Sequence, residues 1–370
     1  MLKKIYTQFQ EHFPFAYFSF LMVLCNFVGL FFSRALLSIS MMGLIAIALL
    51  SPQLKKNVSL FLKSKSDILL TGMFFLYAIS YFWSEDKIYW SSRLQLMGPF
   101  LVLPIAFISL PQWEKNWWEK AVLFFILLCF GGVCWSSFYY AQHFQEINSM
   151  YKFSKTIPTP FKNDHIRFSL SLVISIICCG LFLFKNNNSK IIKISSLVLG
   201  TIFIVFLHIL SVRSALISLY LVAFYFLIIF LIKQKSIKNI LILISLASLF
   251  IILMYNYSAP FKAKINYTKW TFEQFNNPKA FSTTSDGARI FSYKAAFQIF
   301  KNNPIIGVGT GDVHLAMKKE YLNLGVPELN IIPHNQFLLL LVSLGIIGFV
   351  YFIVLLFFLK KKVSTKNIFI

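Results

Sequence analysis

Acidic side chains are scarce in this sequence, and their scarcity sets the first limits on its class. The 370 residues include 13 Asp and Glu against 35 Lys and Arg, which gives a formal net charge of +22. Only 13% of the residues are charged and 58% are hydrophobic, whereas soluble domains carry about 25% charged residues. This composition excludes a disordered chain, a disulfide-rich secreted domain and an ordinary soluble enzyme. It is typical of a polytopic helical membrane protein.

Cysteine is scarce as well, and it gives no sign of a redox or metal site. No C-x-x-C pair occurs, and the five cysteines all lie in apolar stretches: Cys25, Cys129, Cys134, Cys178 and Cys179. We interpret them as small packing residues. The basic residues are spread between apolar stretches instead of forming one patch, which argues against nucleic acid as a partner.

Long apolar runs are abundant, and they predict the membrane spans. A helix needs about 20 apolar residues to cross the hydrocarbon core. We find ten runs of about that length, so we predict an all-α membrane protein of about 10–12 transmembrane helices. The runs cover residues 13–32, 35–50, 68–83, 94–110, 121–140, 168–184, 191–210, 214–232, 240–257 and 336–359.

The charges between the runs predict the orientation. Eighteen lysines fall in short segments that would share one side of the membrane, whereas the opposite short segments carry only Arg34, Lys87, Arg93 and Arg213. The positive-inside rule therefore predicts cytoplasmic N- and C-termini.

Three segments follow from this topology. Residues 1–257 are predicted to hold transmembrane helices, short loops and one medium loop on the outer side at 141–166. Residues 258–333 are predicted to form a long outer loop, in which the spacing of 288–300 predicts an amphipathic helix lying on the bilayer surface. Residues 334–370 supply the last transmembrane helix and a basic cytoplasmic tail. A loop as long as 258–333 is seldom without function.

Arginine is the rare basic residue of this chain, which has 30 Lys and 5 Arg. The predicted topology places every Arg on the outer side. Arginine offers phosphate a planar fork and keeps its proton, so this distribution predicts a phosphate-bearing ligand there, with snorkelling at the interface as the alternative. Arg213 is the strongest candidate, because it lies between two apolar runs with almost no loop. Arg167 is either an anion ligand or an interfacial anchor, and Arg93 and Arg34 are weaker candidates.

Several short motifs stand in a fixed order near the end of the chain. An Arg opens the amphipathic helix, an N-P-x-x-G-x-G turn follows, and a His-Asn pair begins the last apolar run, which contains G-x-x-G. An S-x-R stretch comes before them. In this order the residues are Ser211, Arg213, Arg289, Asn303, Pro304, Gly307, Gly309, His334, Asn335, Gly345 and Gly348. Together the motifs resemble the O-antigen ligase and O-antigen polymerase superfamily of bacterial envelope proteins.

The resemblance implies transfer of a glycan from an undecaprenyl-diphosphate carrier at the outer face of the inner membrane. The partners would be this lipid-linked donor, a lipid A-core or other glycan acceptor, and the lipid bilayer. Negative charge grows on the leaving diphosphate as the glycosidic bond breaks, and fixed cations stabilise that charge. We assign Arg213 and Arg289 to this role, with Arg167 as a possible third cation.

The acceptor hydroxyl must lose a proton, and His334 is the candidate general base. Binding of the diphosphate or a purely structural role are the alternatives for His334. Asn335 is expected to cap the helix or to orient His334, and His165, beside Arg167, is a further candidate for the site. His208, inside a predicted span, is expected to bond to a neighbouring helix.

We predict no cofactor and no metal. Asp312, His314, Glu320 and Glu328 match no standard zinc or calcium spacing, and the chain has no D-x-D. Residues 307–312 (GVGTGD) are not followed by the lysine of a phosphate-binding loop, so we interpret them as a tight turn between helices. The absence of D-x-D favours arginine-based stabilisation of the diphosphate.

Two alternatives to a ligase remain open. A polymerase uses the same donor but joins lipid-linked repeats, and the sequence does not separate the two activities. A transporter of lipid-linked sugars would place its basic residues along a cavity at membrane depth, usually in two related halves, and no such repeat is visible. We expect an inverting reaction, because no carboxylate nucleophile stands out.

Overall fold

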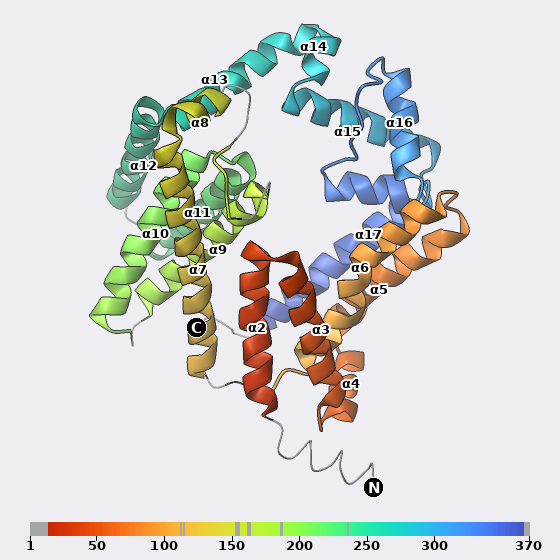
Figure 1. The fold of residues 1–370 in the computed structure, drawn as a ribbon, viewed down its shortest axis with the longest axis horizontal. Helices are drawn as coiled ribbons and strands as arrows, with labels where there is room; N and C mark the ends of the chain where they lie inside the picture. The colour runs from red at the N-terminus through yellow and green to blue at the C-terminus, as the bar shows by residue number, and fades with distance from the viewer. Residues whose placement is uncertain are drawn as a thin grey trace. The chain divides into compact units, whose positions relative to one another are not determined.

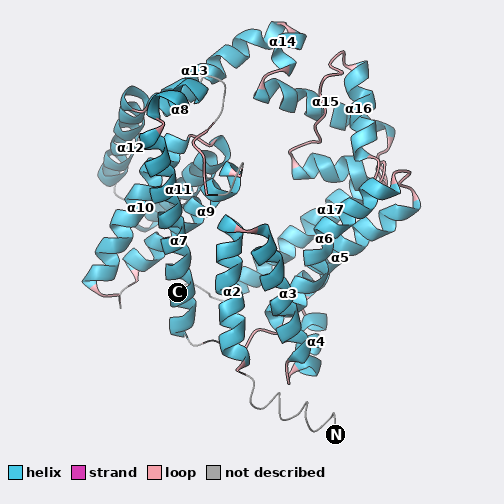
Figure 2. Ribbon diagram, viewed as in Figure 1, coloured by secondary structure: helices cyan, strands magenta, loops and turns pink. Residues whose placement is uncertain are grey.

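The computed structural model describes residues 14–111, 113, 115–151, 156–160, 164–185, 188–234 and 237–365. Within this part of the chain the regular elements are all helices, joined by turns and short loops (Figures 1 and 2). The prediction of an all-α fold is confirmed.

The chain divides into two compact units, and we describe each by itself. The first unit comprises Met1–Met22, Met41–Gln112 and Thr271–Ile370, and the second comprises Val23–Ser40 and Trp113–Trp270. The boundaries fall inside α2 (Phe15–Phe32), α3 (Arg34–Leu50) and α13 (Ala259–Glu273). This division by packing differs from the division into membrane and loop segments made from the sequence, which stays a prediction.

Each of the remaining helices lies within one of the two units. The first unit contains α4 (Leu54–Lys63), α5 (Lys65–Ile79), η1 (Ser80–Phe82), α6 (Lys87–Ile108), η2 (Gln274–Asn276), α14 (Pro278–Ser282), α15 (Ser285–Asn302), α16 (Val313–Asn323) and α17 (Gln336–Thr365). The second unit contains α7 (Lys115–Gln142), α8 (Phe144–Tyr151), α9 (His165–Phe184), α10 (Lys190–Leu210), α11 (Arg213–Gln234) and α12 (Ile237–Tyr257).

Each of the ten apolar runs coincides with a helix. In the described part, six helices are long and apolar enough to span a membrane, or seven if the pair α3 and α4, bent by 107°, is one span. The six are Phe15–Phe32, Lys87–Ile108, Asn116–Gln142, His165–Phe184, Lys190–Leu210 and Gln336–Lys361.

The expected 10–12 spans therefore appear as these six or seven and some shorter apolar helices. The run at 68–83 gives a 15-residue helix, α5, followed by the short turn η1. In α11 and α12, the apolar stretches that could be tested as membrane spans are Arg213–Ile228 and Ser248–Tyr257. Most side chains outside these stretches in the two helices are not described. The chain is a multi-pass membrane protein.

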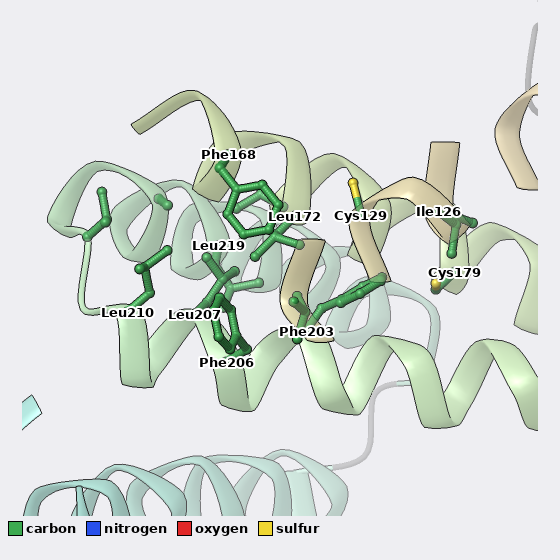
Figure 3. Close-up of a cluster of buried hydrophobic side chains, with 14 of the residues drawn as sticks. Ile126, Cys129, Phe168, Leu172, Cys179, Phe203, Phe206, Leu207, Leu210 and Leu219 are labelled. Atoms are coloured by element: carbon green, nitrogen blue, oxygen red, sulfur yellow. The ribbon is translucent and has the colours of Figure 1, made fainter. Parts of the chain in front are cut away.

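Apolar side chains of α7, α9, α10 and α11 form the core of the second unit. Phe168, Leu172, Phe203 and Leu207 are at most 1% exposed, and Figure 3 shows them gathered between these helices. The described cysteines are free, and Cys129 lies in this core. Tight packing between apolar faces holds helices together where lipid removes any further hydrophobic gain.

In the first unit, α17 packs against α5 through a separate cluster that includes Met73, Tyr77 and Leu340. The Tyr351 hydroxyl donates a 2.9 Å hydrogen bond to the Leu69 carbonyl. A Cβ atom at Gly72 would overlap the Tyr351 hydroxyl. A small residue on α5 therefore lets α17 approach closely.

The amphipathic helix predicted at 288–300 forms as α15, but its partner is protein. Phe291, Ala295 and Ile299 are buried in a cluster with Met317 and Tyr321 of α16. The expectation that this face lies on the bilayer surface is wrong, because the chain turns back after α15 and covers the face with α16 and α17. The part of the long loop from α14 to α16 is thus helical and shares a core with the start of α17.

Candidate functional site

The S-x-R stretch forms the turn between α10 and α11 in the second unit. Ser211 has a left-handed backbone with φ 53° and ends α10, and α11 begins at Arg213. The buried Ser211 hydroxyl donates to the His208 carbonyl at 2.6 Å. His208 Nε2 hydrogen-bonds to the Tyr220 hydroxyl of α11 at 2.8 Å, as expected for a histidine that joins neighbouring helices. This network fixes the direction in which α11 starts.

Arg213 hydrogen-bonds to a residue that is distant in the sequence. Its Nη2 donates a 2.8 Å hydrogen bond to Thr268 Oγ1 on α13, and the residue is partly buried. Thr268 in turn donates to the Lys264 carbonyl at 2.8 Å. The bond to Thr268 orients the guanidinium, a planar group with five donors.

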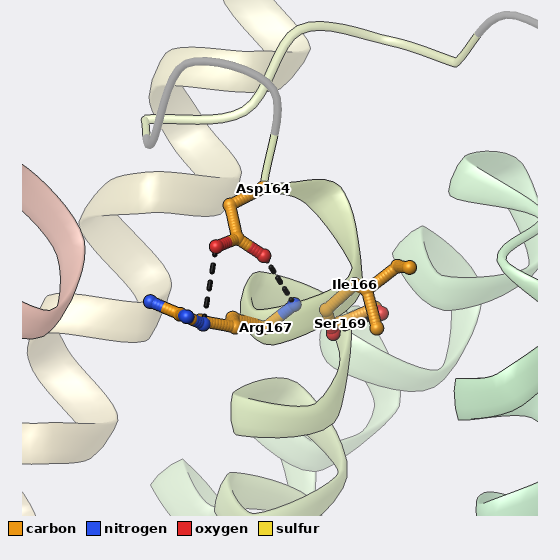
Figure 4. Close-up of polar contacts among 4 residues, drawn as sticks. All are labelled: Asp164, Ile166, Arg167 and Ser169. Atoms are coloured by element: carbon orange, nitrogen blue, oxygen red, sulfur yellow. Dashed lines mark hydrogen bonds and ion pairs between the residues drawn. The ribbon is translucent and has the colours of Figure 1, made fainter. Parts of the chain in front are cut away.

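Arg167 begins α9 together with its capping residue. Asp164 accepts a 3.2 Å hydrogen bond from the Arg167 backbone nitrogen, and its other oxygen lies 3.1 Å from Arg167 Nε. Figure 4 shows the carboxylate bridging these two nitrogens. The Arg167 side chain is 56% exposed, so this ion pair contributes little to stability. Its neighbour His165 is partly buried and lies within electrostatic reach of Lys264.

Lys185 and Lys190 lie at the opposite end of the helices of the second unit. Lys185, which follows α9, pairs with Glu119 in the first turns of α7 at 2.5 Å. Because α9 and α10 form an antiparallel hairpin, the start of α9 and the end of α10 share the other end. Arg167 and Arg213 therefore lie together at one end of this unit, away from Lys185 and Lys190.

Arg289 lies near the start of α15 in the first unit. The Thr284 hydroxyl caps this helix by accepting a 3.0 Å hydrogen bond from the Gly287 nitrogen. A Cβ atom at Gly287 would overlap the Phe281 carbonyl, so the close turn from α14 into α15 requires glycine. The Arg289 side chain is exposed, and no acidic group among the described residues pairs with it.

The N-P-x-x-G-x-G turn is inserted into a break in α17. The nitrogens of Val308 and Gly309 donate to the carbonyls of Val342 and Ser343 at 2.9 and 3.0 Å. In return, the Ile346 nitrogen donates to the Pro304 carbonyl at 2.9 Å. The turn thus replaces helix hydrogen bonds that α17 gives up at its break.

Glycines make this close approach feasible. Gly345 interrupts α17 with φ 62° and ψ −157°, a conformation essentially restricted to glycine. Its Cβ would lie 2.3 Å from the Ile305 carbonyl oxygen, and a Cβ at Gly307 would lie 2.5 Å from the Val342 oxygen. Both motif glycines therefore have a structural reason, and the expectation of a tight turn between two helices is confirmed.

His334 and Asn335 occupy the loop that enters α17. The Asn335 side-chain oxygen accepts hydrogen bonds from the nitrogens of Phe337 at 2.9 Å and Leu338 at 3.4 Å. The expected cap is confirmed, and such caps satisfy the free N–H groups of a helix start. His334 is exposed, and no hydrogen bond to its ring is found among the described residues.

The Asp312 carboxylate accepts hydrogen bonds from backbone nitrogens. Its two carboxylate oxygens each accept a 2.8 Å hydrogen bond, from the nitrogens of Glu85 and Asp86. These bonds fasten the turn before α16 to the start of α6. Within the described residues no group of three or more His, Cys, Asp and Glu side chains is arranged to hold a metal ion.

The predicted site residues fall into two groups, one in each unit. Arg289, His334 and Asn335 belong to the first unit, whereas Arg213, Arg167 and His165 belong to the second. Sequence reasoning missed Thr268, because nothing in the sequence pairs it with Arg213. It also missed Asp164, although a helix-capping Asp three residues before Arg167 was a readable signal.

The fold defines a multi-pass helical membrane protein. Its candidate arginines lie near helix starts, Arg167 and Arg213 in the second unit and Arg289 in the first. Residues 197–353 match the family model described as O-Antigen ligase. The matched region runs from α10 into α17 and includes Arg213, Arg289 and His334. The resemblance to the O-antigen ligase and polymerase superfamily is confirmed over these residues, and at family level it supports an enzyme with O-antigen ligase-type activity. Comparison with curated proteins finds no match.

Proposed function

We propose that this protein transfers a glycan from undecaprenyl diphosphate to a sugar hydroxyl at the periplasmic face of the bacterial inner membrane. The preferred activity is that of an O-antigen ligase with lipid A-core as acceptor. The observation that carries the proposal is that the region matching the O-Antigen ligase family contains the three candidates Arg213, Arg289 and His334.

Arginine side chains stabilise the leaving group of the proposed reaction. Arg213 and Arg289 stabilise the charge that grows on the departing diphosphate, and Arg167 is a third cation for the same group. The fixed bond from Arg213 to Thr268 supports this role, since a pre-oriented cation needs no reorganisation during the reaction. No metal is required for this step, because guanidinium groups provide the positive charge.

His334 is the general base of the proposed reaction. Its exposed imidazole removes the proton from the acceptor hydroxyl, which then attacks the anomeric carbon of the donor sugar. The bond between that carbon and the diphosphate oxygen breaks in the same displacement, so the configuration inverts. Asn335 supports His334 by fixing the backbone at the start of α17, and His165 lies beside Arg167 as a supporting residue.

A deletion strain tests the proposal when it is rescued with wild type, Arg289→Ala or His334→Ala. We expect both variants to leave long glycans on undecaprenyl diphosphate and the acceptor bare, because loss of one transition-state donor costs about 10²–10³ in rate. Arg34→Ala is the matched control, since Arg34 belongs to neither group of site residues.

Other outcomes would redirect the assignment. Acceptors that carry a single repeat would identify a polymerase. Repeats trapped on the cytoplasmic face, or no change at all, would contradict transfer and point to transport or to a structural role. Retention of configuration in the product linkage would contradict the single displacement.

A further inference from the structure

A cavity of about 220 Å³ lies in the first unit, where the end of α5, the start of α6 and the start of α17 meet. None of the roles assigned so far uses it. Its polar lining consists of Tyr77, Tyr89, Arg93, Thr310, Gln336 and Ser343. Apolar side chains, among them Leu96, Met97 and Leu339, complete the wall. An apolar wall with a few converging polar groups is the ordinary make-up of a ligand site.

Arg93 supplies the charge of this cavity. Its guanidinium lies over the Tyr89 ring, 4.4 Å from the centroid, and its Nη2 donates to the Tyr89 hydroxyl. No carboxylate pairs with Arg93 among the described residues. The ring orients the cation through a cation–π contact without neutralising it, so the positive charge remains for an anion that enters the cavity.

The cavity has a buried floor and an open rim. Tyr77, Thr310 and Ser343 are at most 4% exposed, and Gln336 is exposed. Two anchors hold the floor: Ser80 hydrogen-bonds to Thr310 at 2.6 Å, and Asp312 fastens the following residues to α6. Leu96 is exposed as well, so the rim is open on the side of Gln336 and Leu96, and a ligand there meets a preformed floor.

The size of the cavity limits its ligand. Drug-sized molecules need about 300–1,000 Å³, so a space of about 220 Å³ holds one ring or head group of a larger molecule. Sugars suit the lining, because its hydroxyl, amide and guanidinium groups match the oxygens of a sugar.

The cavity is also close to the proposed general base. Gln336, which lines it, lies two residues after His334, and an extended chain spans at most about 3.6 Å per residue. The Cα atoms of these two residues are therefore within about 7 Å of each other. The cavity therefore lies beside the backbone that carries the proposed base.

We propose that this cavity binds one sugar ring of the acceptor glycan and that Arg93 contacts an anionic substituent of that ring, a carboxylate or a phosphate. The assignment to the acceptor rests on the proposed function. The binding of an anionic sugar does not, so the two claims can fail separately.

Binding is tested on the full-length chain in detergent micelles by saturation-transfer NMR titration with glucose, glucuronic acid and glucose 6-phosphate. We expect both anionic sugars to bind more tightly than glucose. Arg93→Gln should raise their Kd about tenfold or more, because a hydrogen bond to a charged group is worth about 1.5–3 kcal/mol. Tyr89→Phe removes only the hydroxyl that holds Arg93 and should raise Kd less. Arg34→Gln is the matched control and should bind like wild type.

Equal affinity for the neutral and anionic sugars, or unchanged binding in Arg93→Gln, would overturn the proposal. So would a lipid that copurifies with wild type and is lost from Arg93→Gln, since it would identify the cavity as a lipid site. Where transfer is measurable, Arg93→Gln should raise the KM for the acceptor and leave the KM for the donor unchanged. A raised donor KM would overturn the assignment to the acceptor, whereas binding without any transfer would contradict only the proposed function.

Discussion

At the scale of single residues, Arg213 and Arg167 lie at the same helix end but are held in different ways. Arg213 hydrogen-bonds to the neutral Thr268 hydroxyl, whereas Arg167 is paired with the Asp164 carboxylate. A neutral partner orients a guanidinium and preserves its charge, while a carboxylate reduces the attraction for a second anion. The ion pair with Asp164 therefore makes Arg167 a weaker candidate for binding a diphosphate.

This difference predicts a graded effect of substitutions. Arg213→Gln should lower the transfer rate by about 100-fold or more, because it removes a fixed cation from the transition state. Arg213→Lys should fall between this variant and wild type, since it keeps the charge but loses the planar fork. Thr268→Ala should lower the rate by about tenfold or less, because it costs one hydrogen bond of about 0.5–1.5 kcal/mol. The measurement is the rate of glycan transfer in membranes from the rescued deletion strain.

The unfolding temperature of each variant in detergent is the control. Equal losses of activity in Thr268→Ala and Arg213→Gln, with a lower unfolding temperature in both, would show that Arg213 only joins α11 to α13. Full activity in Arg213→Gln would remove it from the mechanism.

At the scale of elements, the break in α17 explains two of the glycine motifs at once. The turn at 303–309 exchanges backbone hydrogen bonds with residues 342–347, and Gly345 supplies the conformation that opens the helix. The same helix is capped at its start by Asn335, beside His334.

The break gives a prediction for stability. Gly345→Ala should lower the free energy of unfolding by at least about 1–3 kcal/mol, the cost of a residue held in a disfavoured backbone region. The clash with the Ile305 carbonyl adds to that cost. Gly98→Ala in α6 is the matched control, because a Cβ there meets nothing within 4 Å and alanine favours a helix by about 0.5–1 kcal/mol. Thermal unfolding in detergent measures both, and equal unfolding temperatures would contradict the role of Gly345.

At the scale of the whole molecule, each unit has a lysine of the predicted cytoplasmic side that lies away from the candidate site residues. In the second unit, Lys185 pairs with Glu119 at the end opposite Arg167 and Arg213. In the first unit, Lys65 at the start of α5 lies over the Phe358 ring near the end of α17, 5.7 Å from its centroid. His334 precedes the start of α17, and Arg93 lies in the first turns of α6, which follows α5. These positions fit the predicted orientation, in which Lys65 and Lys185 are cytoplasmic and the arginines lie on the outer side.

Single cysteines in a background without the five native cysteines test this orientation. Ser92→Cys is exposed in the first turns of α6, and Lys190→Cys is exposed at the start of α10. A maleimide that does not cross membranes should label Ser92→Cys in intact spheroplasts, and should label Lys190→Cys only after lysis. The reverse pattern would place the arginines in the cytoplasm and contradict the proposed periplasmic reaction.

The sequence by itself determined the helices and their ends. Apolar runs long enough to span a membrane can satisfy their backbone only as helices, so all ten runs became helices. Local signals also sufficed for the Asn335 cap and for the turn at Ser211, because the interacting groups lie within a few residues of each other. The order of the motifs also indicated the resemblance to the O-antigen ligase family, which residues 197–353 match.

Only the tertiary structure decided which distant residues meet. Arg213 meets Thr268 across 55 positions of sequence, and the cavity joins Tyr77 to Gln336. The apolar face of α15 met α16 and α17, not lipid, because periodicity reveals that a face is apolar but not what covers it. Such contacts depend on how helices pack, and packing is set by the shapes of whole helix faces, which no local pattern in the chain encodes.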